Sequence, residues 1–517
     1  MSAPLAGHTV AIVGGGAIGT ALFRVLVDRL SAETLLRAKT RIVLYEKSGR
    51  VGPGLAYAKD GAPYVLNQSA QTMSLVPGHR AHFCEWLEER GLFRGEKSED
   101  LFCERQVFGD YVEDQFVRAQ EKARRAGLAV ATVRDDVSTL ASRRSGYRVV
   151  TPAHPPMDAD VVVLALGNLP SAKFRDLEGY PSFLASPYPS AEMCARIPAN
   201  ARVAIAGTGL SAIDAALALF AAGHESRVTL ASRSGLLPAV RGPLLIRELH
   251  HITRAHIARE TDHGRRALKW PTVLRWLEME MQRHDVSVSW HNDFPSWAPP
   301  TEYVASQVAA AQNGARIWQS IGEALNPMLE VLWHHLAADD KRLFVDRFYS
   351  RFMSHWVPIP LTNAQKMLTL LEERRLTVER NLTRVAFDAN ANVFRLDFAD
   401  EGTTTCDYFV NATGAPRHLS ECHSPLVQSL LAQGTIRAHA FGGICVDFDS
   451  LHAIGKDDCS DPSLFAVGNL TSGTHLFTST LELNVEKADR IAARIVSDLL
   501  RRAPSKDMRG DATPHPA

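Results

Sequence analysis

The sequence has few cysteines, no excess of either charge and no long hydrophobic run, and each lack excludes a class of protein. Its seven cysteines include no Cys-x-x-Cys pair, so neither a disulfide framework nor the close redox pair of a disulfide reductase is expected. Lysine and arginine together number 57, as do aspartate and glutamate. Bulk charge therefore gives no reason to expect nucleic acid or an anionic membrane as a partner, and a small-molecule substrate is expected instead.

Export, membrane and metal signals are also missing. No apolar segment approaches the roughly 20 residues that a membrane-spanning helix needs. A glycine-rich turn begins at Gly14, after a start that contains no lysine or arginine, so a signal peptide has no room and we expect a cytoplasmic protein. The histidines within residues 250–263 lack the His-Glu-x-x-His spacing of a zinc helix, and no metal site is predicted.

A βαβ unit is predicted near the N-terminus. The apolar run Val10–Val13 predicts a strand, which stops at a glycine turn and is followed by apolar residues at helical spacing. The turn has the spacing Gly14-x-Gly16-x-x-Gly19. Gly14 permits the tight turn, Gly16 lets backbone N–H groups approach a pyrophosphate, and Gly19 lets the helix pack closely on the strand.

An acid completes this first pattern. Residues 41–45 predict a second strand that ends at Glu46, whose carboxylate would accept hydrogen bonds from an adenosine ribose. A GxGxxG string alone is weak evidence. Here the strand before it, the helix after it and the acid agree, and together they predict a dinucleotide-binding site.

The same pattern recurs later in the chain. A strand over residues 203–206 leads into Gly207-x-Gly209, and alanine takes the third glycine position, which the fingerprint tolerates. The next predicted strand, residues 228–231, is followed by Arg233 rather than by an acid. A guanidinium there can bind a 2′-phosphate bidentately, which favours NADPH; the alternative is a solvated loop arginine.

Two dinucleotide folds in one chain predict the α/β class, with two Rossmann-like dinucleotide-binding domains and a helical insertion. Strands that end at Gly167 and Gly414 mark passages between the domains, and tryptophan-rich amphipathic stretches over about 240–375 predict the insertion. The expected parts are a first domain over 1–195, a second domain with the insertion over 196–375, a return to the first domain over 376–500 and a disordered tail over 501–517.

Several short phrases carry a resemblance to one family. They are Gly52-Pro-Gly-Leu-Ala-Tyr57, Leu66-Asn67 with Met73-Ser74, Phe83-x-x-Trp86-Leu87, Arg105-x-x-Phe108-Gly109-x-Tyr111, Ser232-Arg233-x-Gly-Leu-Leu-Pro238 and Asn411-Ala-Thr-Gly414. Over roughly residues 8–500 the chain resembles the bacterial FAD/NAD(P)-binding flavoprotein monooxygenases. That family includes flavin-dependent amine N-monooxygenases and an FAD-dependent urate hydroxylase type.

The resemblance implies a single-component monooxygenase in which NAD(P)H reduces bound FAD and O2 supplies the oxygen atom. It implies flavin-site roles for Asn67, Arg105 and Asn469. Asn469 stands where many FAD proteins have an aspartate, and its amide can still form hydrogen bonds, although it carries no charge. Because the oxygen chemistry belongs to the flavin, no metal ligand or nucleophilic triad is required, and no catalytic residue is assigned.

The resemblance also orders the expected substrates. A purine comes first, with conversion of urate to 5-hydroxyisourate in purine metabolism, and N-hydroxylation of an amino acid or amine comes second. Two other hypotheses are an FAD-containing NAD(P)H reductase that oxygenates nothing, and a nucleotide-binding sensor without turnover. Oxidation of NAD(P)H that depends on substrate and consumes O2 would distinguish the monooxygenase from both.

Overall fold

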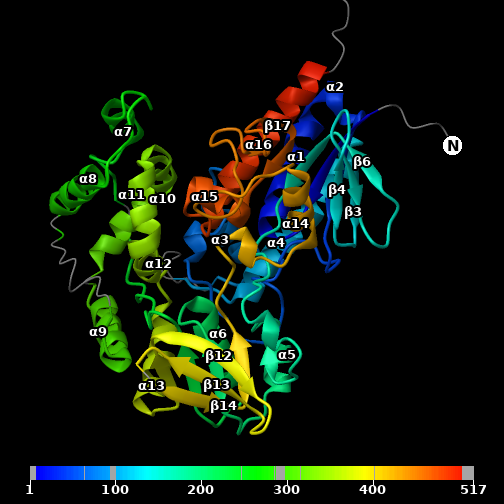
Figure 1. Ribbon diagram of the computed structural model, residues 1–517. Helices are drawn as coiled ribbons and strands as arrows, with labels where there is room; N and C mark the ends of the chain where they lie inside the picture. Colours follow the sequence, from blue (N-terminus) through cyan, green and yellow to red (C-terminus); the bar gives the residue numbers. More distant parts are fainter. Residues whose placement is uncertain are drawn as a thin grey trace, which may run out of the picture.

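The computed structural model describes residues 7–62, 64–93, 101–245, 247–284, 286, 297–314, 316–400 and 402–502. Within these ranges the chain forms two large, mainly parallel sheets, two small antiparallel sheets and a helical unit (Figure 1). The predicted α/β class with two Rossmann-like units and a helical insertion is confirmed. None of the helices in these ranges combines the length and the apolar character needed to cross a bilayer.

The first sheet has the strand order β16-β17-β7-β1-β2-β3 and takes strands from both ends of the chain. Its strands are β1 (His8–Val13), β2 (Thr40–Tyr45), β3 (Ala129–Val133), β7 (Val161–Leu164), β16 (His452–Ile454) and β17 (Ser460–Ala466). Neighbours are parallel except β16 and β17. Val10, Ala11 and Ile12 of β1 are fully buried. A strand covered on both faces explains why this segment is a continuous apolar run.

Helices cover one face of the first sheet and a small sheet covers the other. The helices are α1 (Ala17–Ala32), α4 (Arg105–Ala126) and α16 (Leu481–Arg502). The opposite face packs against α14 (Pro425–Gln433) and the antiparallel strands β4 (Thr139–Ser142), β5 (Tyr147–Val150) and β6 (Met157–Ala159). Shorter elements in the connections are α2 (Thr34–Arg37), α3 (His82–Glu89), α5 (Ser190–Arg196), α15 (Ser472–His475), η1 (Ala70–Thr72), η2 (Arg175–Leu177), η4 (Leu419–Glu421) and η5 (Gly468–Thr471).

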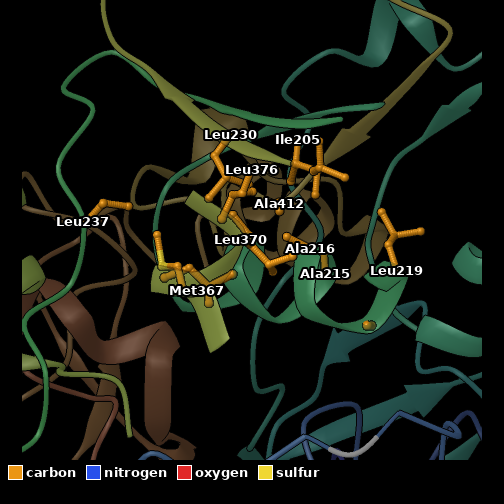
Figure 2. Close-up of a cluster of buried hydrophobic side chains, with 14 of the residues drawn as sticks. Ile205, Ala215, Ala216, Leu219, Leu230, Leu237, Met367, Leu370, Leu376 and Ala412 are labelled. Carbon is orange, nitrogen blue, oxygen red and sulfur yellow. The ribbon is translucent and has the colours of Figure 1, made fainter. Parts of the chain in front are cut away.

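The second sheet is parallel, with the strand order β11-β10-β9-β15-β8. Its strands are β8 (Phe183–Leu184), β9 (Val203–Ala206), β10 (Val228–Ala231), β11 (Leu376–Glu379) and β15 (Tyr408–Asn411). One face packs on α6 (Leu210–Ala221) and α13 (Leu361–Glu372), and Figure 2 shows Leu219 and Met367 in that core. The other face packs on the antiparallel strands β12 (Leu382–Asp388), β13 (Val393–Phe398) and β14 (Thr403–Cys406).

The strand assignments move the predicted domain limits. β8 precedes residue 196, β11 begins at Leu376 and β15 follows it, yet all three belong to the second sheet. The chain therefore enters the second unit earlier than predicted and leaves it later, after β15. A buried apolar strand looks the same in either sheet, so sequence alone did not locate the crossings. Of the predicted tail, Arg501 and Arg502 continue α16, and residues 503–517 lie outside the described residues.

The predicted helical insertion is confirmed between the two halves of the second unit. Its helices are α7 (Arg254–Glu260), α8 (Trp270–Arg283), α9 (Pro300–Gln312), α10 (Ile317–His335), α11 (Ala338–Leu343), η3 (Phe344–Phe348) and α12 (Tyr349–Trp356). Figure 1 shows them as a green column beside the two sheets. The insertion contacts the first unit, because Trp333 Nε1 donates a hydrogen bond to the carbonyl of Gly473 at 2.7 Å and Lys487 Nζ lies 2.5 Å from Glu330 Oε2.

Candidate functional site

The first glycine turn lies at the carboxyl end of β1. Gly14 has φ +103°, a conformation that favours glycine, and its N–H donates to the carbonyl of Tyr45 at 3.0 Å. A Cβ on Gly14 would collide with the carbonyl oxygen of Ala165, and a Cβ on Gly19 would collide with that of Gly14. Both positions therefore exclude any side chain, and α1 packs directly on the turn.

Gly16 immediately precedes α1 and faces a second glycine. A Cβ built on Gly54 would lie 3.2 Å from Gly16 Cα, and Gly52 donates its N–H to the carbonyl of Gly15 at 2.8 Å. No side chain caps the amino end of α1. The uncapped N–H groups and the lack of side chains suit a pyrophosphate, which a helix amino terminus attracts.

Glu46 lies beside this turn. Its Oε2 accepts the N–H of Gly15 at 2.9 Å, and its Oε1 accepts hydrogen bonds from the backbone and the hydroxyl of Ser48 at 2.9 and 2.8 Å. The carboxylate is thus held against the backbone of the glycine turn.

The second glycine turn repeats the first at the carboxyl end of β9. Gly207 has φ +116°, and a Cβ there would lie 2.7 Å from the carbonyl oxygen of Ala412. Gly209 begins α6, and a Cβ there would meet no atom within 4 Å. Thr208 Oγ1 donates to the carbonyl of Leu236 at 2.6 Å and lies 3.1 Å from Ser232 Oγ. These contacts join the turn after β9 to the turn after β10.

Two arginines follow neighbouring strands at this edge. Arg233 follows β10 and is exposed. Arg380 follows β11, and its guanidinium lies 4.1 Å from the ring centroid of Trp297. The backbones are joined because Asn381 donates its N–H to the carbonyl of Arg233 at 3.1 Å. Arg380 was not predicted from the sequence. The apolar strand that ends at Glu379 could have indicated it, because Arg380 directly follows that strand.

Glycines at the strand ends leave the carboxyl edges of both sheets open. A Cβ on Gly167, Gly209, Gly414 or Gly468 would meet nothing within 4 Å. These glycines follow β7, β9, β15 and β17. Open α/β sheets bind ligands outside the carboxyl ends of their strands, so both sheets present a free edge where a nucleotide is expected.

Arg105 is engaged in an ion pair between the two units. Its Nη2 lies 2.7 Å from Oδ2 of Asp214 in α6, with the two side chains 15% and 5% exposed. Tyr188 donates its hydroxyl to the same oxygen at 3.3 Å. Burial raises the pKa of Asp214, and the charge of Arg105 acts in the opposite direction. The predicted flavin-site residue therefore connects α4 to the helix that follows the second turn.

Asn67 lies where three units meet. Its backbone carbonyl accepts a hydrogen bond from Nη2 of Arg241, in the second unit, at 3.4 Å. Arg241 Nη1 lies 3.8 Å from Oε2 of Glu323 in α10. Burial lowers the pKa of Arg241, and Glu323 opposes that shift.

Asn469 follows Gly468 at the end of β17. Its Oδ1 accepts a hydrogen bond from Thr478 Oγ1 at 3.3 Å, and Asn484 Nδ2 donates to the carbonyl of Thr478 at 2.8 Å. His475, between them, is fully buried, and burial lowers its pKa to about 3. The amide of Asn469 is thus held by the segment that leads into α16, on the same edge of the first sheet as Gly14.

The predicted residues form two groups. Gly14, Gly16, Gly19, Glu46 and Asn469 belong to the first edge, and Gly207, Gly209 and Arg233 belong to the second. Asn67 and Arg105 lie at junctions between units. Within the described ranges, no three His, Cys, Asp or Glu side chains are grouped to hold a metal ion, and the seven cysteines are free thiols.

This fold, with two dinucleotide turns on two sheets, is that of a two-domain flavoprotein. Residues 11–169 match the family model described as FAD-NAD(P)-binding, which agrees with the predicted cofactors, FAD and NAD(P)H. The uncharacterized protein YdhS of Escherichia coli is 24% identical over 415 residues, which cover 70% of this chain and 75% of YdhS.

Solved structures share the fold over nearly the whole chain. The ornithine hydroxylase PvdA of Pseudomonas aeruginosa is 14% identical, with a TM-score of 0.59 over 95% of this chain and 99% of that chain. The ornithine N-hydroxylase KtzI of Kutzneria sp. 744, whose structure is described with reduced FAD, NADP+ and L-ornithine, is 16% identical, with a TM-score of 0.52 over 96% of this chain and 100% of that chain. At these identities the likeness concerns the fold.

Proposed function

We propose that this chain is a flavin-dependent monooxygenase that hydroxylates the nitrogen of a small amine or amino acid. The observation that carries the proposal is the presence, in one chain, of two sterically obligatory glycine turns at the open edges of two sheets. The overall reaction is R–NH2 + O2 + NAD(P)H + H+ giving R–NHOH + NAD(P)+ + H2O. NAD(P)H supplies the two electrons, one oxygen atom enters the product and the other leaves as water.

The first edge would hold FAD. Gly14, Gly16 and Gly19 leave room for a pyrophosphate against the backbone, and Glu46 is fixed where the adenosine ribose would lie. Asn469 would donate its amide to the flavin side of the cofactor. When bound, the flavin accepts a hydride and activates O2. The chain's own tasks are to bind and orient the reactants and to exclude water.

The second edge would hold the nicotinamide nucleotide. Gly207 and Gly209 would bind its pyrophosphate at the start of α6. Arg233 and Arg380 follow adjacent strands there, and two guanidinium groups favour a nucleotide with a 2′-phosphate. We therefore propose NADPH as the donor.

The order of substrates differs from the one expected from the sequence. The ornithine hydroxylases that share this fold over their full length favour an amine nitrogen as the atom hydroxylated. Urate and purine metabolism have no such support, and urate enters the test only as a comparison substrate.

The test measures O2 uptake and NADPH oxidation by the FAD-loaded protein with ornithine, lysine, putrescine or urate. We expect one amine to raise both rates equally and to yield a hydroxylamine. Peroxide as the only product, with every substrate, would instead indicate a reductase that oxygenates nothing. Gly14→Val is the inactive comparison, and Gly179→Ala is its matched control, because a Cβ on Gly179 would meet nothing within 4 Å.

A further inference from the structure

Arg417 is a buried cation without an acidic partner. It lies three residues after Gly414, where the chain leaves β15, and its carbonyl accepts the N–H of Gly443 at 3.0 Å. Its guanidinium carbon is 3.9 Å from the ring centroid of Tyr349 in α12. Within the described part of the chain, its three guanidinium nitrogens are buried and have no hydrogen-bond partner. Leaving charged donors buried in that state costs more free energy than leaving a neutral donor so.

Two further basic side chains lie in the same region. Lys341 Nζ is 5.5 Å from the ring centroid of Trp333 and donates a hydrogen bond to the carbonyl of His334 at 3.1 Å. Burial lowers the pKa of Lys341. Burial also lowers the pKa of His439 to about 4, and Lys341, Arg437 and Arg417 all push it in that direction.

The charges that act on His439 are therefore all positive. Arg437 has its own acid, Asp458, whereas no ion pair with a described carboxylate is found for Arg417 or Lys341. We call Arg417, Lys341 and His439 the basic cluster. With its pKa lowered to about 4, His439 is uncharged at neutral pH, so the uncompensated cations are Arg417 and Lys341. Cations held without a counter-charge destabilise the folded chain, which a bound anion would reverse.

The basic cluster contacts the turn that begins at Asn469. A Cβ on Gly473 would collide with His439 Nδ1, and the carbonyl of Gly473 accepts the indole N–H of Trp333. A Cβ on Gly442 would lie 2.8 Å from Arg417 Cγ and 3.4 Å from Ser472 Oγ. The basic cluster thus lies between the exit from the second unit, the helical insertion and the segment proposed to face the flavin.

We propose that Arg417 and Lys341 bind a small oxyanion, a carboxylate or a phosphate group, beside the turn that follows β17. The rings of Tyr349 and Trp333 cover one side of each cation. The N–H groups of Arg417 and Lys341 are then the donors that an oxyanion would contact. This identification rests on the proposed function: the anion is either the carboxylate of an amino acid substrate or a phosphate of the nicotinamide nucleotide.

The first experiment uses inorganic phosphate and the full-length, FAD-loaded protein without turnover. Thermal melting is compared in phosphate and in chloride at equal ionic strength. We expect phosphate to raise the melting temperature by roughly 2 °C, and Arg417→Met to abolish this rise. Lys341→Met is the second variant and decides the question if Arg417→Met does not fold. Arg342→Met, at an exposed neighbouring position, is the control and should respond like the parent.

A rise that persists in the variants that fold would overturn the proposal. The second experiment identifies the source of the anion. If it is a substrate carboxylate, Arg417→Met should raise KM for ornithine roughly tenfold or more and leave KM for putrescine unchanged. If it is a nucleotide phosphate, the same variant should weaken NADPH in flavin reduction measured without amine. A phosphate response with no oxidation of any amine would refute the monooxygenase and leave the anion site standing.

Discussion

The two glycine turns have the same backbone and opposite chemistry at the end of the next strand. Gly14 and Gly207 both have positive φ, and a side chain on either would strike the carbonyl of a neighbouring strand. After the next strand, the first unit presents a carboxylate at Glu46 and the second presents Arg233, with Arg380 after the neighbouring strand β11. The glycine backbone, which both turns share, suits the pyrophosphate that all dinucleotides contain. The side chains after the next strand differ and can distinguish one dinucleotide from another.

The two turns also differ in how closely other segments cover them. At the first turn the loop that holds Gly52 and Gly54 lies over the glycines and is hydrogen-bonded to them. At the second turn a Cβ added to Gly209 would meet nothing within 4 Å. A covered turn suits a resident cofactor, and an open one suits a nucleotide that binds and leaves in each cycle.

The largest expected effect separates the two turns outright. Gly19→Val forces a side chain into the carbonyl of Gly14, so we expect loss of FAD and of most folded protein. Gly207→Val should keep FAD and lose reduction by NADPH. Flavin absorbance after gel filtration and the rate of flavin reduction measure the two results. Loss of FAD in Gly207→Val would contradict the assignment of separate nucleotides to the turns.

The next effect concerns the ion pair that links the turns. Asp214→Asn leaves Arg105 buried without its counter-charge, which should cost about 3 to 5 kcal/mol of unfolding free energy. Denaturant unfolding measures it. The matched control is Asp158→Asn in the exposed pair with Arg148, which should change nothing measurable. Equal behaviour of the two variants would mean that the buried pair does not hold the units together.

A smaller effect tests the acid of the first turn. Glu46→Gln keeps the shape of the side chain and removes the charge that accepts the Gly15 N–H and would accept a ribose hydroxyl. We expect FAD to bind roughly tenfold more weakly, because hydrogen bonds to a charged group contribute about 1.5 to 3 kcal/mol. Fluorescence titration of apoprotein with FAD gives the constant. An unchanged FAD affinity would place the ribose elsewhere.

The smallest effect tests the arginines of the second turn. Arg233→Ala and Arg380→Ala should each weaken NADPH by roughly tenfold and leave NADH nearly unchanged, since only NADPH carries the 2′-phosphate. Flavin reduction at varied nucleotide concentration measures both constants. Equal losses for NADH and NADPH would show that these side chains do not meet that phosphate.

The glycine turns could be predicted from the sequence because their spacing encodes local geometry. Gly14, Gly16 and Gly19 act within one strand, turn and helix, so the pattern and the structure agree. Asn67 and Arg105 were assigned by resemblance, and the structure shows them in contacts between units.

Contacts between distant segments could not be predicted in this way. Arg380 lies beside the turn after β10 only because β11 pairs with β10, across about 150 residues of chain. Arg417 meets Tyr349 only once the insertion has packed against the segment that follows β15. The limits of the second unit were mispredicted for the same reason. Which strands pair depends on contacts with distant segments, and the residues of one strand do not reveal its partner.

The two crossings between the units run side by side. Ala172 donates its N–H to the carbonyl of Glu421 at 2.7 Å, and His423 donates to the carbonyl of Pro170 at 3.0 Å. A motion of the second unit against the first would have to bend both paired segments together and separate the Arg105–Asp214 ion pair.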